Sequence, residues 1–136
     1  VLPLLYQTGY LTIKFYDEES GHYQLGYPNR EVEVAFLESL LGVFSQLDEP
    51  VQNDVIFRMV RELKKPNFDA FFELFKGFLA SIPYELHMPK EKYYQNIFYL
   101  VFKLVGLQLH AEVHTNRGRI DAVMVGKDKR LIFELK

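Results

Sequence analysis

The sequence predicts an α+β fold in which a β-hairpin and three helices precede a fourth helix and a three-stranded antiparallel sheet. Apolar residues recur at helical spacing in four segments between Arg30 and Val105, a pattern typical of core-facing helices. After Gly106 the apolar period changes from 3.6 to 2, which is typical of strands. Near the N-terminus, β-branched and aromatic residues form two short runs around a polar loop, which predicts a hairpin.

The first elements are expected in a subdomain over residues 1–88, which would link to a missing upstream module. The hairpin strands are expected over residues 10–16 and 22–27. Asn29 is a suitable N-cap for the next helix, and Glu31 would lie in its first turn, where the helix dipole favours an acid. The helices of this part are expected over residues 30–46, 51–63 and 68–80.

The second part, residues 89–136, is predicted to hold a helix and a sheet. The helix is expected over residues 91–105, where apolar residues cover most of its circumference, so it should be buried on most sides. Gly106 is expected to end it. The strands that follow are expected over residues 107–115, 119–125 and 130–136.

Composition bounds the classes of protein that the chain can represent. Its 136 residues are 49% hydrophobic and 15% aromatic, which favours a folded core over disorder. The absence of cysteine excludes disulfides and thiolate metal sites and is compatible with a cytoplasmic protein. No apolar run approaches the roughly 18 residues of a membrane span, and no signal-peptide pattern opens the chain, so no membrane partner is expected. Both ends look cut from a longer protein.

Charge is distributed unevenly along the chain. The formal net charge of −2 predicts no bulk affinity for polyanions. Residues 101–136 hold seven Lys and Arg against four acids, a net charge of +3, which leaves −5 for the remainder. This local basic surface is compatible with phosphate contacts, although ordinary scatter of charge would give the same difference.

The last two strands bring two acids together. With Lys127 and Asp128 as a two-residue loop, antiparallel pairing places Asp121 opposite Glu134, with Cβ atoms about 4.5–5.5 Å apart. Alternation places Lys136 on the same face as Glu134. A register slip of one residue would instead put the acids on opposite faces.

Facing carboxylates repel by up to roughly 1 kcal/mol on an exposed sheet, and by more where water is excluded. Because both last strands carry apolar residues on both faces, we expect them to be covered. A divalent cation would offset the repulsion, since carboxylates, carbonyls and waters are the ligands of Mg²⁺. The alternative is a structural ion-pair cluster in which Lys136 neutralises the two acids.

Residues 112–123 and 131–136 resemble the core of the PD-(D/E)XK nuclease superfamily, whose helix–strand–strand–strand order also matches residues 91–136. The fold class is therefore a truncated α/β nuclease core of restriction-endonuclease-like type within an α+β chain. Residues 4–13, 25–29 and 93–106 resemble a bacterial family in which a predicted AAA-type ATPase precedes a C-terminal nuclease-like domain.

The resemblance implies that Asp121 and Glu134 bind Mg²⁺ or Mn²⁺ and that Lys136 acts in catalysis. The supporting candidates are Glu91, Gln95 and Glu112, and the candidate contacts to nucleic acid are Arg117 and Arg119, for which solvated surface charges are the alternative. His110 and His114 are expected on one strand four residues apart, too far apart for one metal ion.

The sequence departs from the superfamily pattern at two points. Ile120 stands where Pro precedes the acid, which the superfamily tolerates, and the helix and strand that normally follow E-x-K are missing. We therefore expect an open sheet edge and face, so the fragment either pairs with another copy or is inactive alone. The chain has no G-x-x-x-x-G-K-[ST] motif, so any ATPase activity would belong to the upstream module.

The sequence thus predicts a divalent-metal-dependent nuclease that hydrolyses DNA or RNA, with DNA favoured. Two alternatives stay open. One is a catalytically silent nuclease-like module that binds nucleic acid or protein, and the other is a structural domain with an accidental ion-pair patch.

Overall fold

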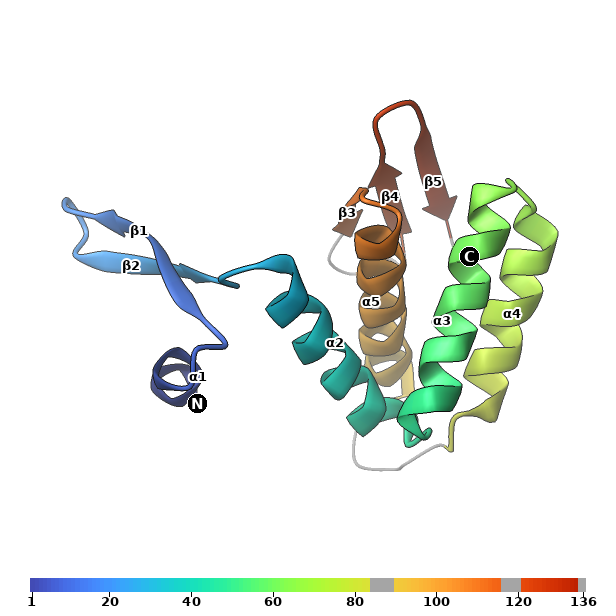
Figure 1. The fold of residues 1–136 in the computed structure, drawn as a ribbon, viewed down its shortest axis with the longest axis horizontal. Helices are drawn as coiled ribbons and strands as arrows, with labels where there is room; N and C mark the ends of the chain where they lie inside the picture. The colour runs from blue at the N-terminus through green and yellow to red at the C-terminus, as the bar shows by residue number, and fades with distance from the viewer. Residues whose placement is uncertain (84–89, 116–120, 135–136) are drawn as a thin grey trace. The chain divides into compact units, whose positions relative to one another are not determined.

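The computed structural model describes residues 1–83, 90–115 and 121–134, and it confirms the predicted α+β class (Figure 1). Contacts within the chain separate two compact units, residues 1–36 and 37–136. The predicted boundary after residue 88 is a different one, since it separates the nuclease-like core from the residues before it. That boundary stays a prediction. The elements are α1 (Leu2–Gln7), β1 (Thr12–Asp17), β2 (His22–Gly26), α2 (Arg30–Ser45), α3 (Glu49–Lys64), α4 (Phe68–Ser81), α5 (Lys90–Gln108), β3 (Glu112–Thr115), β4 (Asp121–Val125) and β5 (Arg130–Glu134).

The first unit contains the predicted hairpin, in which β1 and β2 pair antiparallel. Asp17 closes the loop, because its carboxylate accepts hydrogen bonds from the Glu19 N–H (3.0 Å) and the Ser20 hydroxyl (2.6 Å). Gly21 follows with a φ of 70°, a conformation that glycine adopts without strain. Helix α1 is not among the predicted elements, since its six residues, fewer than two turns, are too few for a periodic pattern.

The three helices that follow match their predicted ranges to within two residues at each end. The predicted cap of α2 is confirmed, because the Asn29 side chain accepts a hydrogen bond from the Val32 N–H at 2.9 Å. Asn67 caps α4 in the same way, accepting from the Ala70 N–H at 3.3 Å. No helix in the described ranges has the length and apolar composition that a bilayer crossing requires.

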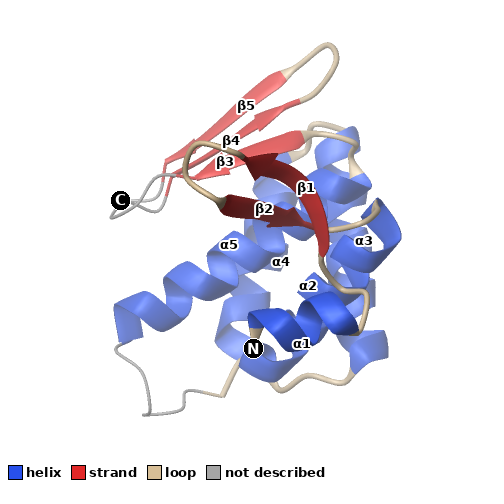
Figure 2. Ribbon diagram, turned by 90° about the vertical axis from the view of Figure 1, so that its left-hand side faces the viewer, coloured by secondary structure: helices blue, strands red, loops and turns tan. Residues whose placement is uncertain are grey.

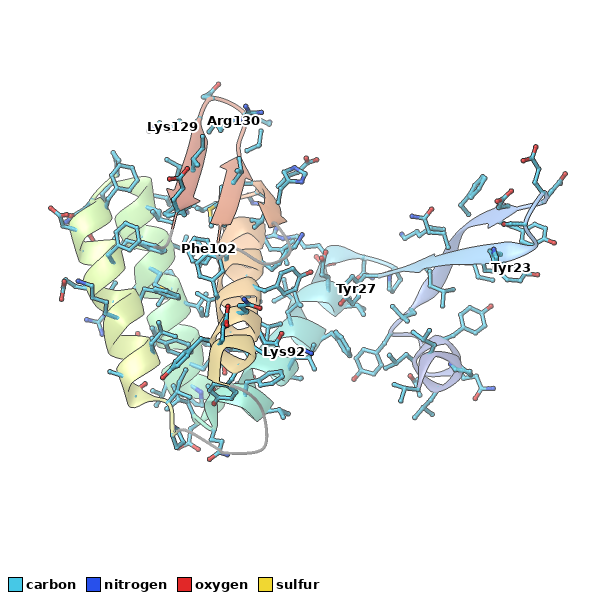
Figure 3. All side chains as sticks on the ribbon, turned by 180° about the vertical axis from the view of Figure 1, so that it is seen from behind. Tyr23, Tyr27, Lys92, Phe102, Lys129 and Arg130 are labelled. Carbon is cyan, nitrogen blue, oxygen red and sulfur yellow. The ribbon has the colours of Figure 1, made fainter. Side chains whose placement is uncertain are left out.

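Aromatic side chains form the core of the second unit. Phe102 of α5 is 1% exposed and occupies the centre of this cluster (Figure 3). Its ring centroid lies 4.9 Å from that of Phe133 in β5 and 5.8 Å from that of Phe71 in α4. Phe75 and Phe98 complete the cluster, at 5.7 and 4.2 Å from Phe102. Strand β5 is therefore fixed by aromatic contacts to both α4 and α5.

Helix α5 is buried on most sides, as predicted, but it does not end at Gly106. It continues to Gln108 and ends in a Schellman motif, in which the Ala111 N–H bonds to the Gly106 carbonyl (2.8 Å) and the His110 N–H to the Leu107 carbonyl (3.2 Å). His110 takes the left-handed position of this motif, with a φ of 54°. The prediction that residues 107–111 begin the first strand is therefore wrong.

Gly106 has a packing role instead of a terminating one. A Cβ atom at this position would collide with the side chain of Val113 in β3, which is 6% exposed. The Lys103 ammonium of α5 also donates to the Val113 carbonyl at 3.0 Å. These contacts hold β3 directly against the last turns of α5.

Strands β3, β4 and β5 form an antiparallel sheet in sequence order, next to α5 (Figure 2). One face of this sheet is buried against helices, where Val113, Ala122, Met124 and Phe133 are all at most 6% exposed. The alternate positions lie on the other face. That second face carries the candidate site.

Candidate active site

The register of the β4–β5 hairpin places Asp121 directly opposite Glu134, which confirms the predicted pairing. The same register pairs Val123 with Ile132 and Val125 with Arg130. Directly opposed residues of an antiparallel pair have Cβ atoms about 4.5–5.5 Å apart, a separation at which two carboxylates can share one ligand. The two candidate metal-binding positions are therefore neighbours across the pair of strands.

The face that holds this acid pair is open in the part of the chain that the structure describes. Ile132 is 65% exposed, and Glu134 and Arg130 are exposed too. The expectation that both faces of these strands are covered is therefore wrong for the described residues, because the helices pack against the Phe133 face alone. The open face agrees instead with the expectation drawn from the lack of a helix and strand after E-x-K. Water screens facing charges on an open sheet, so repulsion between the acids stays within roughly 1 kcal/mol.

Strand β3 adds two polar side chains to the same face. His114 lies opposite Val123, and Glu112 lies opposite Val125, four residues along β4 from Asp121. At about 3.4 Å per residue, Glu112 is roughly 13 Å along the sheet from the acid pair. His114 is only two residues along the sheet from it. The His114 Nε2 atom and a Glu112 carboxylate oxygen are 3.6 Å apart. The structure therefore places Glu112 away from the candidate site and His114 nearer to it.

This placement corrects the interpretation of the two histidines. They do not share a strand, because His110 belongs to the end of α5 and β3 begins at Glu112. Alternate residues of a strand share one face, and His114 lies opposite Val123. This alternation is the sequence signal that could have placed His114 on the face of the acid pair.

The supporting candidates on α5 lie one turn apart, as expected. Glu91 is exposed in the first turn, and its carboxylate accepts a 3.4 Å hydrogen bond from the Gln95 amide. Lys136, Arg117 and Arg119 lie outside the described residues.

The residues present suit a divalent cation in their chemistry. Asp121 and Glu134 are oxygen donors on adjacent strands, the ligand type that Mg²⁺ and Mn²⁺ prefer. Within the described residues, three or more His, Asp or Glu side chains are nowhere grouped so that they could hold a metal ion. Further ligands at the acid pair would then be waters, backbone carbonyls or groups outside the described ranges.

Comparison with known proteins relates the chain to one curated protein and part of it to one superfamily. A protein of Azotobacter chroococcum mcd 1, named "Uncharacterized protein in vnfD 5'region", is 33% identical to the chain over 144 aligned residues. The alignment covers 98% of this chain and 27% of the relative, so the chain spans about a quarter of that protein's length. No solved structure matches the chain. Residues 89–136, which contain the Asp121–Glu134 pair, match the family model of the PD-(D/E)XK nuclease superfamily.

Proposed function

We propose that this chain carries the catalytic part of a divalent-metal-dependent nuclease that hydrolyses phosphodiester bonds, in DNA rather than RNA. The observation that supports the proposal most is the register that sets Asp121 opposite Glu134. This pair lies inside the segment that matches a nuclease superfamily model, on a face that a polymeric substrate can reach.

Each residue has a distinct role in this proposal. The carboxylates of Asp121 and Glu134 would hold Mg²⁺ or Mn²⁺. When bound, such an ion activates water and neutralises negative charge on the phosphate. Lys136 follows Glu134 by two residues, so alternation would set its ammonium on the acid side, where it stabilises charge that develops on the phosphoryl oxygens. Glu91 and Gln95 would support the site through their hydrogen bond.

Cleavage assays test this assignment. With Mg²⁺ or Mn²⁺ present, the protein should nick supercoiled plasmid or shorten a labelled oligonucleotide. The variants Asp121→Asn, Glu134→Gln and Lys136→Ala should each lose on the order of 10²-fold or more in rate. Glu73→Gln removes an exposed carboxylate on α4 and serves as the matched control, which should keep the full rate. Isothermal calorimetry that detects no Mg²⁺ or Mn²⁺ binding would refute the enzymatic proposal.

The second candidate is a catalytically silent module that binds nucleic acid or protein. It is favoured by Ile132, a 65% exposed apolar side chain on the same face as Glu134, since such a residue suits a docking surface. Intact substrate in the presence of bound metal, together with retained nucleic-acid affinity, would select this candidate over the enzyme.

We also propose that the chain acts within a longer, ATPase-linked protein. This rests on the resemblance of residues 4–13, 25–29 and 93–106 to a family with an upstream AAA-type ATPase. Pairing of two copies through the incomplete sheet and a cytoplasmic location likewise stay predictions.

A further inference from the structure

A cavity of about 240 Å³ lies at the opposite end of the β4–β5 hairpin from the acid pair. It is bounded by the C-terminal ends of α3 and α5 and by the turn that joins β4 to β5. We call it the hairpin cavity. Its apolar lining is Leu63, Leu109, Ala111, Met124 and Leu131, and its charged lining is Lys64, Lys127, Lys129 and Asp128.

The charges of the hairpin cavity are unbalanced. Lys64, Lys127 and Lys129 are all exposed, and none of them forms an ion pair with an acid in the described part of the chain. Asp128 is the one acid among the lining residues, so three positive charges face one negative charge. Lysine stays protonated at neutral pH, so the site carries an excess positive charge. An anionic ligand would complement it.

The lining between the lysines narrows the class of anion. Met124 is 2% exposed, and Leu109, Ala111 and Leu131 are half-buried, so a ligand in the cavity meets apolar surface beneath a cationic rim. A small inorganic anion would leave that surface unused. A nucleotide uses both, since its phosphate is charged and its base has apolar faces. Proteins that bind single strands without sequence preference combine these two features.

The cavity lies on the helix-packed side of the sheet, to which Met124 and Leu131 belong, whereas the acid pair lies on the other side. Cationic residues connect the two sides around the tip of the hairpin. Arg130 follows Lys129 at the tip of the hairpin (Figure 3) and lies opposite Val125, on the face that also carries Ile132 and Glu134. From Arg130 to Glu134 is four residues, or about 13 Å of strand. A strand stacked as in duplex DNA, with a rise of about 3.4 Å per nucleotide, would cover this length with about four nucleotides, and an extended strand would cover it with fewer.

We propose that the hairpin cavity binds one nucleotide of a single-stranded nucleic acid that passes around the tip of the hairpin to a scissile bond at Asp121 and Glu134. Lys64, Lys127 and Lys129 contact its phosphate and the phosphates of the neighbouring nucleotides, and the apolar lining receives its base. The inference rests on the proposed function for the position of the scissile bond. The binding of the nucleotide itself needs no metal and no cleavage.

Salt dependence of binding is the test. Affinity for a fluorescein-labelled twelve-residue oligothymidylate is measured by fluorescence anisotropy at several NaCl concentrations, with EDTA present so that no cleavage occurs. Each neutralised phosphate of a single strand contributes about 0.7 to the slope of log K against log [NaCl]. The triple variant Lys64→Gln/Lys127→Gln/Lys129→Gln should therefore lower the magnitude of the slope by about 2. Because all three side chains are exposed, the variant should keep its fold, which circular dichroism checks.

A second triple variant, Lys14→Gln/Lys76→Gln/Lys92→Gln, removes the same charge from positions that do not line the cavity, and its slope should stay near that of the parent.

The contribution of the base is tested with an oligomer of equal length in which abasic sugar phosphates replace all thymidines. It should bind at least about 5-fold more weakly than the oligothymidylate.

Three results would overturn the inference. They are a parent protein that does not bind oligothymidylate, equal slope changes in the two triple variants, and equal affinity for the abasic oligomer. Cleavage gives an independent readout. An inactive protein that still shows the expected slopes would refute the nuclease proposal while keeping the nucleotide site. An active protein whose cavity variant has an unchanged slope would refute the nucleotide site while keeping the nuclease proposal.

Discussion

Two helical glycines should respond in opposite ways to the same substitution by alanine. At Gly106 of α5, the new methyl group would collide with the Val113 side chain and lie 3.3 Å from the Ala111 carbonyl oxygen. At Gly77 of α4, nothing lies within 4 Å of the new methyl group. Gly77→Ala is therefore the matched control for Gly106→Ala.

The expected magnitudes follow from two terms. Replacing glycine by alanine inside a helix stabilises it by about 0.8–1.0 kcal/mol, and this gain applies at both positions. Overpacking a buried contact costs about 1–3 kcal/mol, and Val113 is 6% exposed, so this cost applies at Gly106 alone. Gly77→Ala should thus raise the free energy of unfolding by about 1 kcal/mol, while Gly106→Ala should lower it by about 1 kcal/mol.

Urea unfolding followed by far-UV circular dichroism measures both values, provided that the three proteins share one slope of free energy against urea. A Gly106→Ala protein that is stabilised as much as Gly77→Ala would refute the close packing of β3 against α5.

Three further predictions concern the core, a cap and a titrating acid. Phe102→Ala should lower the free energy of unfolding by about 3–5 kcal/mol, because it empties the centre of the aromatic cluster; a loss below 1 kcal/mol in urea unfolding would contradict this packing. Asn67→Ala should cost about 1 kcal/mol through loss of the α4 cap, and Asn67→Asp should restore most of it; equal stability of the Ala variant and the parent in urea would exclude the cap. Burial, and to a lesser degree the charge of Glu49, raises the pKa of Glu38 above its ordinary 4.5, so ionisation of Glu38 disfavours the fold. Stability linked to Glu38 therefore falls as pH rises from about 4.5, and the melting temperature of Glu38→Gln relative to the parent should increase between pH 4.5 and 7; a difference that does not change with pH would contradict the shift.

The candidate site was predictable because its signal is local. Antiparallel pairing around Lys127 and Asp128 fixes every facing pair of the hairpin, and the alternation of apolar residues fixes the faces. The positions of Asp121 and Glu134 follow from these two rules alone. The start of α2 was predictable for the same reason, since the Asn29 side chain caps it, and the helix ranges followed from the spacing of apolar residues.

The features that were not predictable depend on contacts distant in sequence. Glycine often ends a helix, but Gly106 lacks a side chain because Val113 packs against it. His110 takes the left-handed position at the helix end instead. Apolar residues on both faces of β5 suggested a covered strand, whereas the lack of a helix and strand after E-x-K suggested an open face. Ile132 is 65% exposed in the described structure, which agrees with the second expectation and not with the first. Which face of a sheet the helices cover is decided by tertiary packing, which a strand's own sequence does not encode.

The aromatic cluster also limits how the protein can be dissected. The segment that matches the superfamily model begins at residue 89, but Phe98 and Phe102 of α5 pack against Phe75 and Phe71 of α4. A polypeptide trimmed to residues 89–136 would leave these rings in water, so it should aggregate rather than fold. A stably folded fragment that contains residues 89–136 should therefore also include α4, which supplies the other rings of the cluster.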